Sequence, residues 1–479
     1  MDDQLLVDLL QTLDAPQAEF ARLNRYYAGT QDLAFLAPES KKALGDRFSR
    51  MATNLPRLAV TSLAERLRVN GFDGPGDVWA DWTANDLDQY SDLAHREALT
   101  LGSSYAVVWA DAGGSPRVSI ESARQVAVLA DPGSRQITSA VKRWHTRTTT
   151  EAALYLPDVV YRLRADTPGA QSTGFYVVDE LENPLGVVPV VQLRNAERVP
   201  VGWNTYPDRL LEFGHSEIAD LVPLVDGINK LLADMLVAAE YTARPRRYAT
   251  GIELVSMPVL DADGNPVLDG NGKPVMEVQP PIQESWRMMW SEKPEAKFGT
   301  LPGASLDGYE NAVNVLLGQV MAVSALPAHY VGIFTDNPAS ADAIRSSEAS
   351  LTARAEARQN AFGKGWEQVA NLMTAIRTGG IPDEMECRVK WCDPATRSDA
   401  ADADAVTKLF QAGIISRAES LRRLGYTEDQ IQLVSTEKMD ETLDESTAKD
   451  PFRGAVAQAA ADHYKSLKGE IQNDGQRAA

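Results

Sequence analysis

The sequence predicts a mainly helical α+β fold, and three observations support this prediction. Two long segments, near residues 216–239 and 304–326, repeat their apolar residues at the three- and four-residue spacing of amphipathic helices. Residues 104–191 instead hold short alternating runs separated by tight-turn residues, which is typical of strands. At 479 residues the chain is also longer than one core normally supports, so we expect two to four structural regions.

The helical patterns begin before the strands. They dominate the first 100 residues, where NLPRLAVTSLAERLRV gathers its leucines and alanines on one face and its arginines elsewhere. Strands are then expected at SYAVVWA (104–110), RVSIES (117–122), QVAVLA (125–130) and FYVVDE (175–180). Turns such as DAGGSP and ADPGSR separate them.

Three long helices follow the strands. The first starts near Ser216 and runs for about seven turns, with Pro223 marking either a kink or a restart. The second, 304–326, spaces its apolar residues like the seam of a helix packed along another helix. The third begins after a possible N-cap at Ser340 and ends at Gly379, which gives about 38 residues and about 57 Å.

After the third long helix, the predicted helices are shorter. Ser416 with Glu419, and Thr427 with Gln430, have the spacing of capping boxes and predict a small helical bundle. The tail 438–479 is polar and acidic, and we expect much of it to lack fixed structure. We identify no internal repeat.

The segment 260–280, LDADGNPVLDGNGKPVMEVQP, resembles a calcium loop only in its first half. Asp261, Asp263 and Asn265 would supply the first three ligands. The sixth position is then Pro266, where glycine is needed, and the twelfth is Gly272, which has no ligand atom. The Asp-Gly and Asn-Gly pairs instead predict tight turns between short strands, so we expect a β excursion and no metal.

Composition excludes several classes of protein. The acidic excess of 67 − 47 = 20 charges disfavours strong attachment to nucleic-acid backbones or anionic membranes. Two cysteines, Cys387 and Cys392, cannot close a structural zinc site and are expected to be reduced thiols. The start, MDDQLLVDLL, is acidic where a signal peptide is basic, so we expect a soluble, intracellularly made protein with no membrane contact.

No pattern for catalysis is present, and we predict no enzyme activity and no cofactor. The chain has neither a Walker-type phosphate loop nor a G-x-S-x-G elbow; GHSEI (214–218) lacks the second glycine and indicates a helix start. The acidic pairs Asp402/Asp404 and Glu384/Glu386 are interpreted as solvated surface charge. None of the histidines lies at metal-ligand spacing from another: His95, His145, His215, His329 and His463.

One basic cluster keeps two interpretations. Arg244, Arg246 and Arg247 follow the first long helix within TARPRRYATG. They can be cations placed at a helix C-terminus, where the macrodipole favours them. They can equally be a contact for phosphate or for a protein partner.

The order of helix, β excursion, antiparallel helix, loop and very long helix, after an α/β region, resembles the portal proteins of tailed bacteriophages. Four segments resemble portals of phages infecting actinobacteria in particular. They are NLPRLAVTSLAERLRVNGF (54–72), GHSEIADLVPLVDGINKLLADML (214–236), EKPEAKFGTLPGASLDGY (292–309) and SADAIRSSEASLTARAEARQNAFGKGWEQV (340–369). The likeness spans roughly residues 20–430.

The resemblance implies a portal fold with an α/β wing, two-helix stem, small β-containing clip, long wing helix and helical crown. The implied regions are the wing (1–213), stem helices (214–243 and 304–326), clip (244–303), tunnel loop (327–341), long wing helix (342–380), crown (381–437) and tail (438–479). It also implies a twelve-membered ring in the virion, at one capsid vertex. Its implied partners are double-stranded DNA, the terminase large subunit, a head-tail adaptor and the major capsid or scaffolding protein.

Residue roles follow only from this resemblance. The tunnel loop would contact DNA without gripping it, because 327–344 contains no Lys or Arg. Its expected contacts are Tyr330, Ile333, Phe334, Thr335, Asp336 and Asn337. The clip would contact DNA or partners through Arg244, Arg246, Arg247 and Lys273. Subunits would pack in the stem through Leu232, Met235, Leu316 and Val320.

Two other classes of protein compete with a portal. A different virion component, such as a head-tail adaptor or minor capsid protein, would show neither the same symmetry nor a DNA-width channel. An enzyme would show nuclease or ATPase activity in the purified chain. A calcium-dependent adhesion module is a further alternative, tested by chelation.

Overall fold

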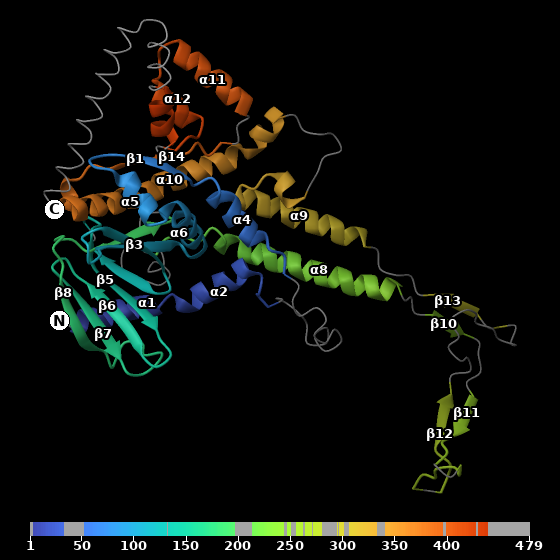
Figure 1. Cartoon of the computed structure of the whole chain (residues 1–479). Helices are drawn as coiled ribbons and strands as arrows, with labels where there is room; N and C mark the ends of the chain where they lie inside the picture. The colour runs from blue at the N-terminus through green and yellow to red at the C-terminus, as the bar shows by residue number, and fades with distance from the viewer. Residues whose placement is uncertain are drawn as a thin grey trace, which may run out of the picture. The chain divides into compact units, whose positions relative to one another are not determined.

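The computed structural model describes residues 3–32, 52–131, 133–196, 213–243, 247–250, 255–261, 264–270, 272–279, 295, 297–300, 306–332, 341–395, 399–427 and 430–438. The chain divides into two compact units (Figure 1). The first comprises 1–31, 52–225 and 319–479, and the second comprises 32–51 and 226–318. The boundary between them falls within two long helices. The fold is of the mixed α+β class that the sequence predicts.

A five-stranded antiparallel meander forms one part of the first unit. Its strands, in sheet order, are β4 (Val126–Ala130), β5 (Ile137–His145), β6 (Thr150–Tyr155), β7 (Val159–Ala165) and β8 (Tyr176–Glu182). Helix α1 (Asp3–Asp14) lies against one face (Figure 1). Leu9, Leu10 and Leu13 pack there against Val141 and Leu154, so this face of the sheet is buried.

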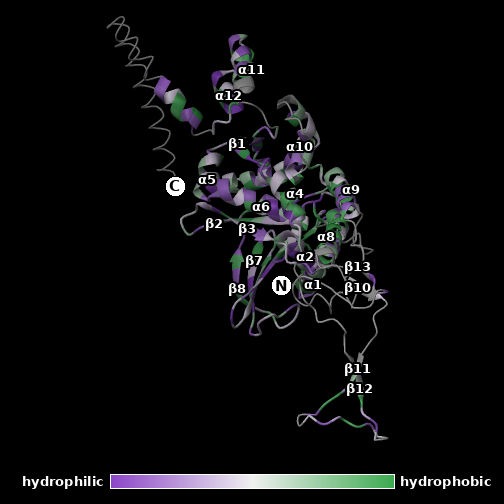
Figure 2. Ribbon diagram, turned by 90° about the vertical axis from the view of Figure 1, so that its right-hand side faces the viewer, coloured by the Kyte–Doolittle hydropathy of each residue, from purple (hydrophilic) through white to green (hydrophobic). Residues whose placement is uncertain are grey.

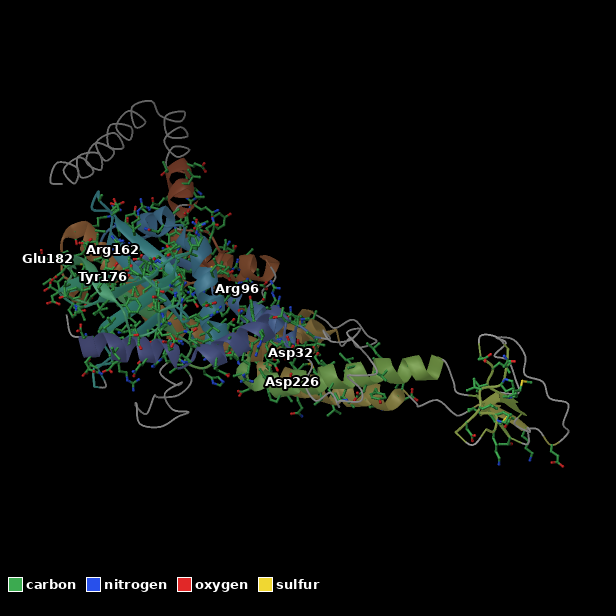
Figure 3. All side chains as sticks on the ribbon, turned by 90° about the horizontal axis from the view of Figure 1, so that it is seen from below. Asp32, Arg96, Arg162, Tyr176, Glu182 and Asp226 are labelled. Atoms are coloured by element: carbon green, nitrogen blue, oxygen red, sulfur yellow. The ribbon has the colours of Figure 1, made fainter. Side chains whose placement is uncertain are left out.

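The edge strand of this sheet, β8, is exposed along most of its length. Arg162 of β7 lies 4.0 Å from Asp179 of β8, and Tyr176 Oη donates to Asp166 at 3.0 Å. Figure 3 labels Arg162, Tyr176 and Glu182 at this edge. Acidic side chains on an exposed edge discourage pairing with another strand.

A second, three-stranded sheet has the order β3 (Pro116–Ser122), β2 (Ser103–Ala110) and β9 (Val190–Arg194). Helices α6 (Leu87–Leu101) and α10 (Ala341–Thr378) pack against it, and α2 (Gln17–Ala28), α4 (Leu55–Ala64) and α5 (Val78–Ala84) pack around α6. Between α6 and α10, the ring of His95 stacks on Phe362. His95 Nε2 accepts a hydrogen bond from Trp366 Nε1 at 2.8 Å, so this histidine is a core residue.

A third sheet was not expected. Strand β1 (Val69–Asp73) lies in the region that we predicted to be helical, and it pairs antiparallel with β14 (Arg388–Trp391). Each strand is only four or five residues long, and more than 300 residues separate them. Short patterns of this kind are overridden by tertiary pairing, which single-sequence periodicity does not reveal.

The three long helices are confirmed, with corrected bounds. Helix α8 runs over Val222–Ala243 after a 3-10 turn at Ala219–Leu221, so Pro223 lies in its first turn, where proline is favoured. Helix α9 runs over Asp307–Ser324, and α10 has 38 residues. Gly379 has a φ of +66° directly after α10, as a helix-ending glycine requires. Ser340, the predicted N-cap, lies outside the described residues.

The C-terminal helices confirm the capping box of Thr427 and Gln430, whereas Ser416 caps its helix but the Glu419 side chain pairs with Arg422 and Arg423. Helices α11 (Asp399–Gln411) and α12 (Arg417–Arg423) pack together, and 430–438 is also helical. Ser416 Oγ accepts from the Glu419 amide at 3.2 Å. The Thr427 amide donates to Gln430 Oε1 at 3.0 Å. Among the described helices, none combines the length and apolarity needed to cross a membrane.

The second unit contains two short ladders and corrects the prediction that the chain has no internal repeat. Strand β10 (Arg247–Thr250) pairs with β13 (Lys297–Thr300), and β11 (Val255–Pro258) pairs with β12 (Met276–Gln279). Between β11 and β12 the sequence PVLDADGN, PVLDGNGK, PVMEVQ repeats every eight residues from Pro258. We missed this repeat because each copy is short and the third continues as a strand instead of turning.

The repeat has threefold hydrogen bonding. The amides of Val267, Val275 and Val259 donate in a closed cycle to the carbonyls of Val259, Val267 and Val275 respectively, each at 2.8 Å. The bridges are equivalent too: the third residue of each octad lies opposite the proline of the next, as Leu260↔Pro266, Leu268↔Pro274 and Met276↔Pro258. We call residues 257–276 the octad tip.

Candidate functional site

An ion-pair junction joins α10 to the segment before α8 and to the end of α9. Arg354 and Arg358 lie one turn apart in α10 and both contact Glu217, at 3.4 Å and 2.6 Å. Arg354 also donates to the carbonyl of Val323 at 2.9 Å. Asn195 Nδ2 donates to Glu217 Oε1 at 3.0 Å. Glu217 and Arg354 together therefore connect α10 with the segment before α8 and with the end of α9.

The backbone next to this junction approaches too closely for a side chain. Gly214 has a φ of +89°, and a Cβ built there would lie 2.2 Å from the carbonyl oxygen of Gly102. Ser216 Oγ donates to the carbonyl of Thr100 at 2.6 Å. The motif GHSEI was predicted to start the helix, but it precedes the 3-10 turn at Ala219–Leu221 and α8; its glycine is required by this contact.

A second cluster holds the segment that follows α9. Arg66 donates to Glu348 of α10 at 3.1 Å and to Tyr330 Oη at 3.2 Å. His329 Nε2 lies 3.4 Å from Glu348 Oε1. Arg66 also donates to the carbonyl of Pro394 at 2.6 Å. Tyr330, which we assigned to DNA contact, is therefore half-buried and tied to the first unit.

Most of the other predicted contacts cannot be placed. Ile333, Phe334, Thr335, Asp336 and Asn337 lie outside the described residues, as do Arg244 and Arg246. The backbone of Arg247 begins β10 opposite Thr300, but its side chain is also outside them. Lys273 is exposed in the octad tip, and its amide donates to Asp269 Oδ1 at 2.9 Å.

The stem residues are described in full. In the second unit α8 and α9 approach closely, since a Cβ at Gly227 would lie 3.2 Å from Leu316 Cδ1. Leu232, Met235 and Leu316 are half-buried, whereas Val320 is fully buried. Figure 2 shows the hydrophobic colouring of α8. From Lys230 to Ala239 no residue of α8 is fully exposed and none is fully buried except Ala233; the residues are apolar apart from Lys230 and Asp234, which pair with each other one turn apart.

Helix α9 has a feature that the sequence analysis did not use. It contains no Lys or Arg, and the whole span from 298 to 344 has none. Its exposed side chains include Asp307, Glu310, Asn311, Asn314 and Gln319. This face is therefore neutral to acidic, which favours weak contact with phosphate. The absence of basic residues was readable in the sequence, but the exposed face required the structure.

The described residues hold no group of three or more His, Cys, Asp or Glu placed to bind a metal ion. Asp261 Oδ1 accepts from the Asn265 amide at 2.9 Å, as expected of a turn residue. Both cysteines are free, and burial raises the pKa of the thiols of Cys387 and Cys392. A raised pKa lowers the thiolate fraction and so makes each a poor nucleophile.

The class of protein follows from its likeness to a known family. A model of the family described as "Phage portal protein, SPP1 Gp6-like" matches residues 12–450. The chain belongs to this family of phage portal proteins.

Two curated relatives show which portal proteins this chain resembles. The chain is 30% identical over 395 residues to the portal protein of Mycobacterium phage L5, covering 78% of this chain and 75% of that one. It is 30% identical over 397 residues to the portal protein of Mycobacterium phage D29, covering 78% and 76%. The predicted resemblance to portals of phages infecting actinobacteria is therefore confirmed.

Similar solved structures include one described as "Neck of empty GTA particle computed with C6 symmetry". The TM-score is 0.46 at 12% identity, covering 85% of this chain and 93% of that one.

Proposed function

We propose that this chain forms a closed ring at one capsid vertex and is the conduit through which double-stranded DNA enters and leaves the head. Membership of the portal family across residues 12–450 carries this proposal. The protein is then a virion component without catalytic activity of its own. A packaging motor, the terminase, would supply the energy and dock on the ring, and head-tail connector proteins would dock there later.

The regional roles are part of the proposal. Residues 1–213 would form most of the wing, 214–243 and 304–326 the stem, 244–303 the clip, and 327–341 the tunnel loop. Residues 342–380 would form the long wing helix and 381–437 the crown. Because β14 pairs with β1, the first residues of the crown segment would be held by the wing. The half-buried apolar side chains of Leu232 and Met235 in α8 support packing against neighbouring copies, since part of their surface is left uncovered within one chain.

We further propose that the exposed face of α9 and the loop after it line the channel. A surface without Lys or Arg neutralises few phosphates and so adds little friction to moving DNA. Arg66, Glu348 and Arg354 would hold the base of this lining through the contacts described above. In this arrangement Tyr330 anchors the loop instead of facing DNA.

Introducing positive charge on this face should slow DNA movement. Asn314 is exposed, and Asn314→Lys adds one positive charge per subunit. We expect the purified ring to bind double-stranded DNA at least about tenfold more tightly at low salt, with the gain lost at high salt. Packaging rate should fall, and Asp336→Lys should act in the same way.

Asn314→Gln is the matched neutral control for this experiment and should leave both binding and packaging unchanged. Equal DNA binding by Asn314→Lys and Asn314→Gln at low salt would place this face outside the channel.

Ring formation is the direct test of the proposed function. Electron microscopy of the purified protein, with native mass spectrometry, should show closed rings of about twelve subunits with an axial channel wide enough for duplex DNA. Where the chain alone stays monomeric, the same measurement is made after co-expression with its scaffolding and capsid proteins. A closed oligomer without a channel would instead favour a head-tail adaptor, and nuclease or ATPase activity in the pure chain would contradict the structural role.

A further inference from the structure

The octad tip exposes apolar side chains at equivalent positions of its repeat. The third residue of each octad is Leu260, Leu268 or Met276, and these are 56%, 58% and 53% exposed. Met257, Val267 and Val275 are exposed as well. In Figure 2 the chain beyond β11 and β12 contains both hydrophobic and hydrophilic residues. Six large apolar side chains are thus exposed within twenty residues, and exposed apolar surface beyond scattered single residues marks interaction sites.

The backbone that carries these side chains is fixed by its own hydrogen bonds. Besides the cycle of three valine amides, both complete octads make the same turn. The Asp261 amide donates to the Asn265 carbonyl at 2.8 Å, and the Asp269 amide donates to the Lys273 carbonyl at 2.7 Å. Gly264 and Gly272 follow with φ of +83° and +74°. A surface ordered in advance loses little entropy on binding.

The charge of the tip favours a partner of opposite charge. Residues 255–279 hold four acids, Asp261, Asp263, Asp269 and Glu277, and one base, Lys273, which gives 1 − 4 = −3. Two such tips would repel one another when brought face to face. A partner with basic residues around an apolar patch would be attracted by both properties.

We propose that the octad tip is a docking site for a protein whose contact surface consists of apolar side chains bordered by Lys and Arg. The inference rests on the proposed function, in which the clip meets the packaging motor and connector proteins. It adds the chemistry of the contact and the side chains that make it. Leu260, Leu268 and Met276 are the anchors, and the acidic residues of the tip set the preference for a basic border.

The probe is a pair of synthetic amphipathic peptides that share one leucine face, one bordered by lysine and the other by glutamate. Binding to the full-length protein is measured by fluorescence anisotropy at physiological ionic strength. The wild-type protein should bind the lysine-bordered peptide at least about tenfold more tightly than the other. Leu260→Asn, Leu268→Asn and Met276→Asn together should remove at least about tenfold of that affinity.

Two controls separate docking from general attraction to an acidic chain. The triple change leaves the charge unaltered, so non-specific attraction predicts no loss. A matched triple at other exposed aliphatic residues, Leu93→Asn, Ile381→Asn and Ile414→Asn, should bind like the wild type; these side chains are 54%, 55% and 69% exposed. Hydrogen-exchange protection of the Val259, Val267 and Val275 amides must survive in the tip variant; if it does not, Leu268→Asn alone is used.

Three results would overturn the inference. They are equal binding of both peptides by the wild type, unchanged binding by the tip variant, and loss of the assembled ring in the tip variant, which would make a second copy the occupant. The proposed function fails separately. Rings that form without a peptide preference reject only the docking inference, whereas an oligomer without a channel rejects the portal role whatever the peptides do.

Discussion

Glu217→Ala should lower the opening free energy of the α10 region by about 3–5 kcal/mol. The side chains of Glu217 and Arg358 are only 6% and 5% exposed. Removing the carboxylate takes away an anion 2.6 Å from the buried Arg358 guanidinium, and Arg354 loses the same partner. Native-state hydrogen exchange of α10 amides measures this, because a chain of two units need not unfold in one transition.

Asp404→Ala is the control for this prediction. Asp404 pairs with Lys408 one turn away on α11, and both side chains are exposed. Loss of such a surface pair should cost less than about 0.5 kcal/mol. If Glu217→Ala cost no more than this control, the junction would not be what holds α8, α9 and α10 together.

Replacing His95 should remove much of the acid sensitivity of the first unit. His95 is fully buried between α6 and α10, and desolvation lowers its pKa from 6.5 to about 3. Below pH 6.5, His95 therefore binds a proton in the unfolded chain but stays neutral in the folded chain. The contribution of His95 to stability is fully present above pH 6.5 and decreases as the pH falls toward 3. The loss attributable to this one group is about 2 kcal/mol at pH 5 and about 4 kcal/mol at pH 3.

His95→Gln tests this because its side-chain oxygen can still accept from Trp366 but does not titrate in this range. Its denaturation midpoint should depend less on pH between 6.5 and 4 than that of the wild type. His145→Gln, at an exposed histidine, should keep the steep wild-type dependence. Parallel pH profiles for His95→Gln and the wild type would mean that other buried groups govern acid unfolding.

Elements marked by a regular hydrophobic pattern or by a capping motif could be predicted from the sequence. The three long helices, the strands predicted at 104–110, 117–122, 125–130 and 175–180, and the helix caps at Ser416 and Thr427 appear in the structure because each depends on a local pattern. The start of the first long helix was wrong by six residues, since Pro223 is accommodated in the first turn and not as a kink. Local patterns identify an element more reliably than its ends.

Long-range features were not predictable in the same way. The β1–β14 ladder, the Glu217 junction and the Arg66–Glu348 pair each join residues separated by more than 100 positions. No periodicity reports such pairings, because they depend on how the elements pack. Buried arginines also resemble surface arginines in a sequence. The family resemblance predicts Tyr330 to be a channel residue, but its contact with Arg66 depends on the packing of distant segments.

The proposed channel and clip residues depend on the resemblance and stay predictions. Leu232, Met235 and Leu316 have the partial exposure that contact between copies needs, which is consistent with their assignment. Val320 is already fully buried within one chain, so it is better suited to packing inside the subunit than to contact between subunits.

The closed valine cycle makes the octad tip an exchangeable cassette. The three valine amides bond to carbonyls of its own three octads, and the chain enters and leaves it side by side, with Val255 opposite Gln279. Paired strand residues lie about 5 Å apart, so a short hairpin turn could close the same gap. A phage could therefore lose, lengthen or trade this cassette without rebuilding the rest of the protein. Specificity for a partner could then change by recombination of some twenty codons while the remaining chain is inherited unaltered.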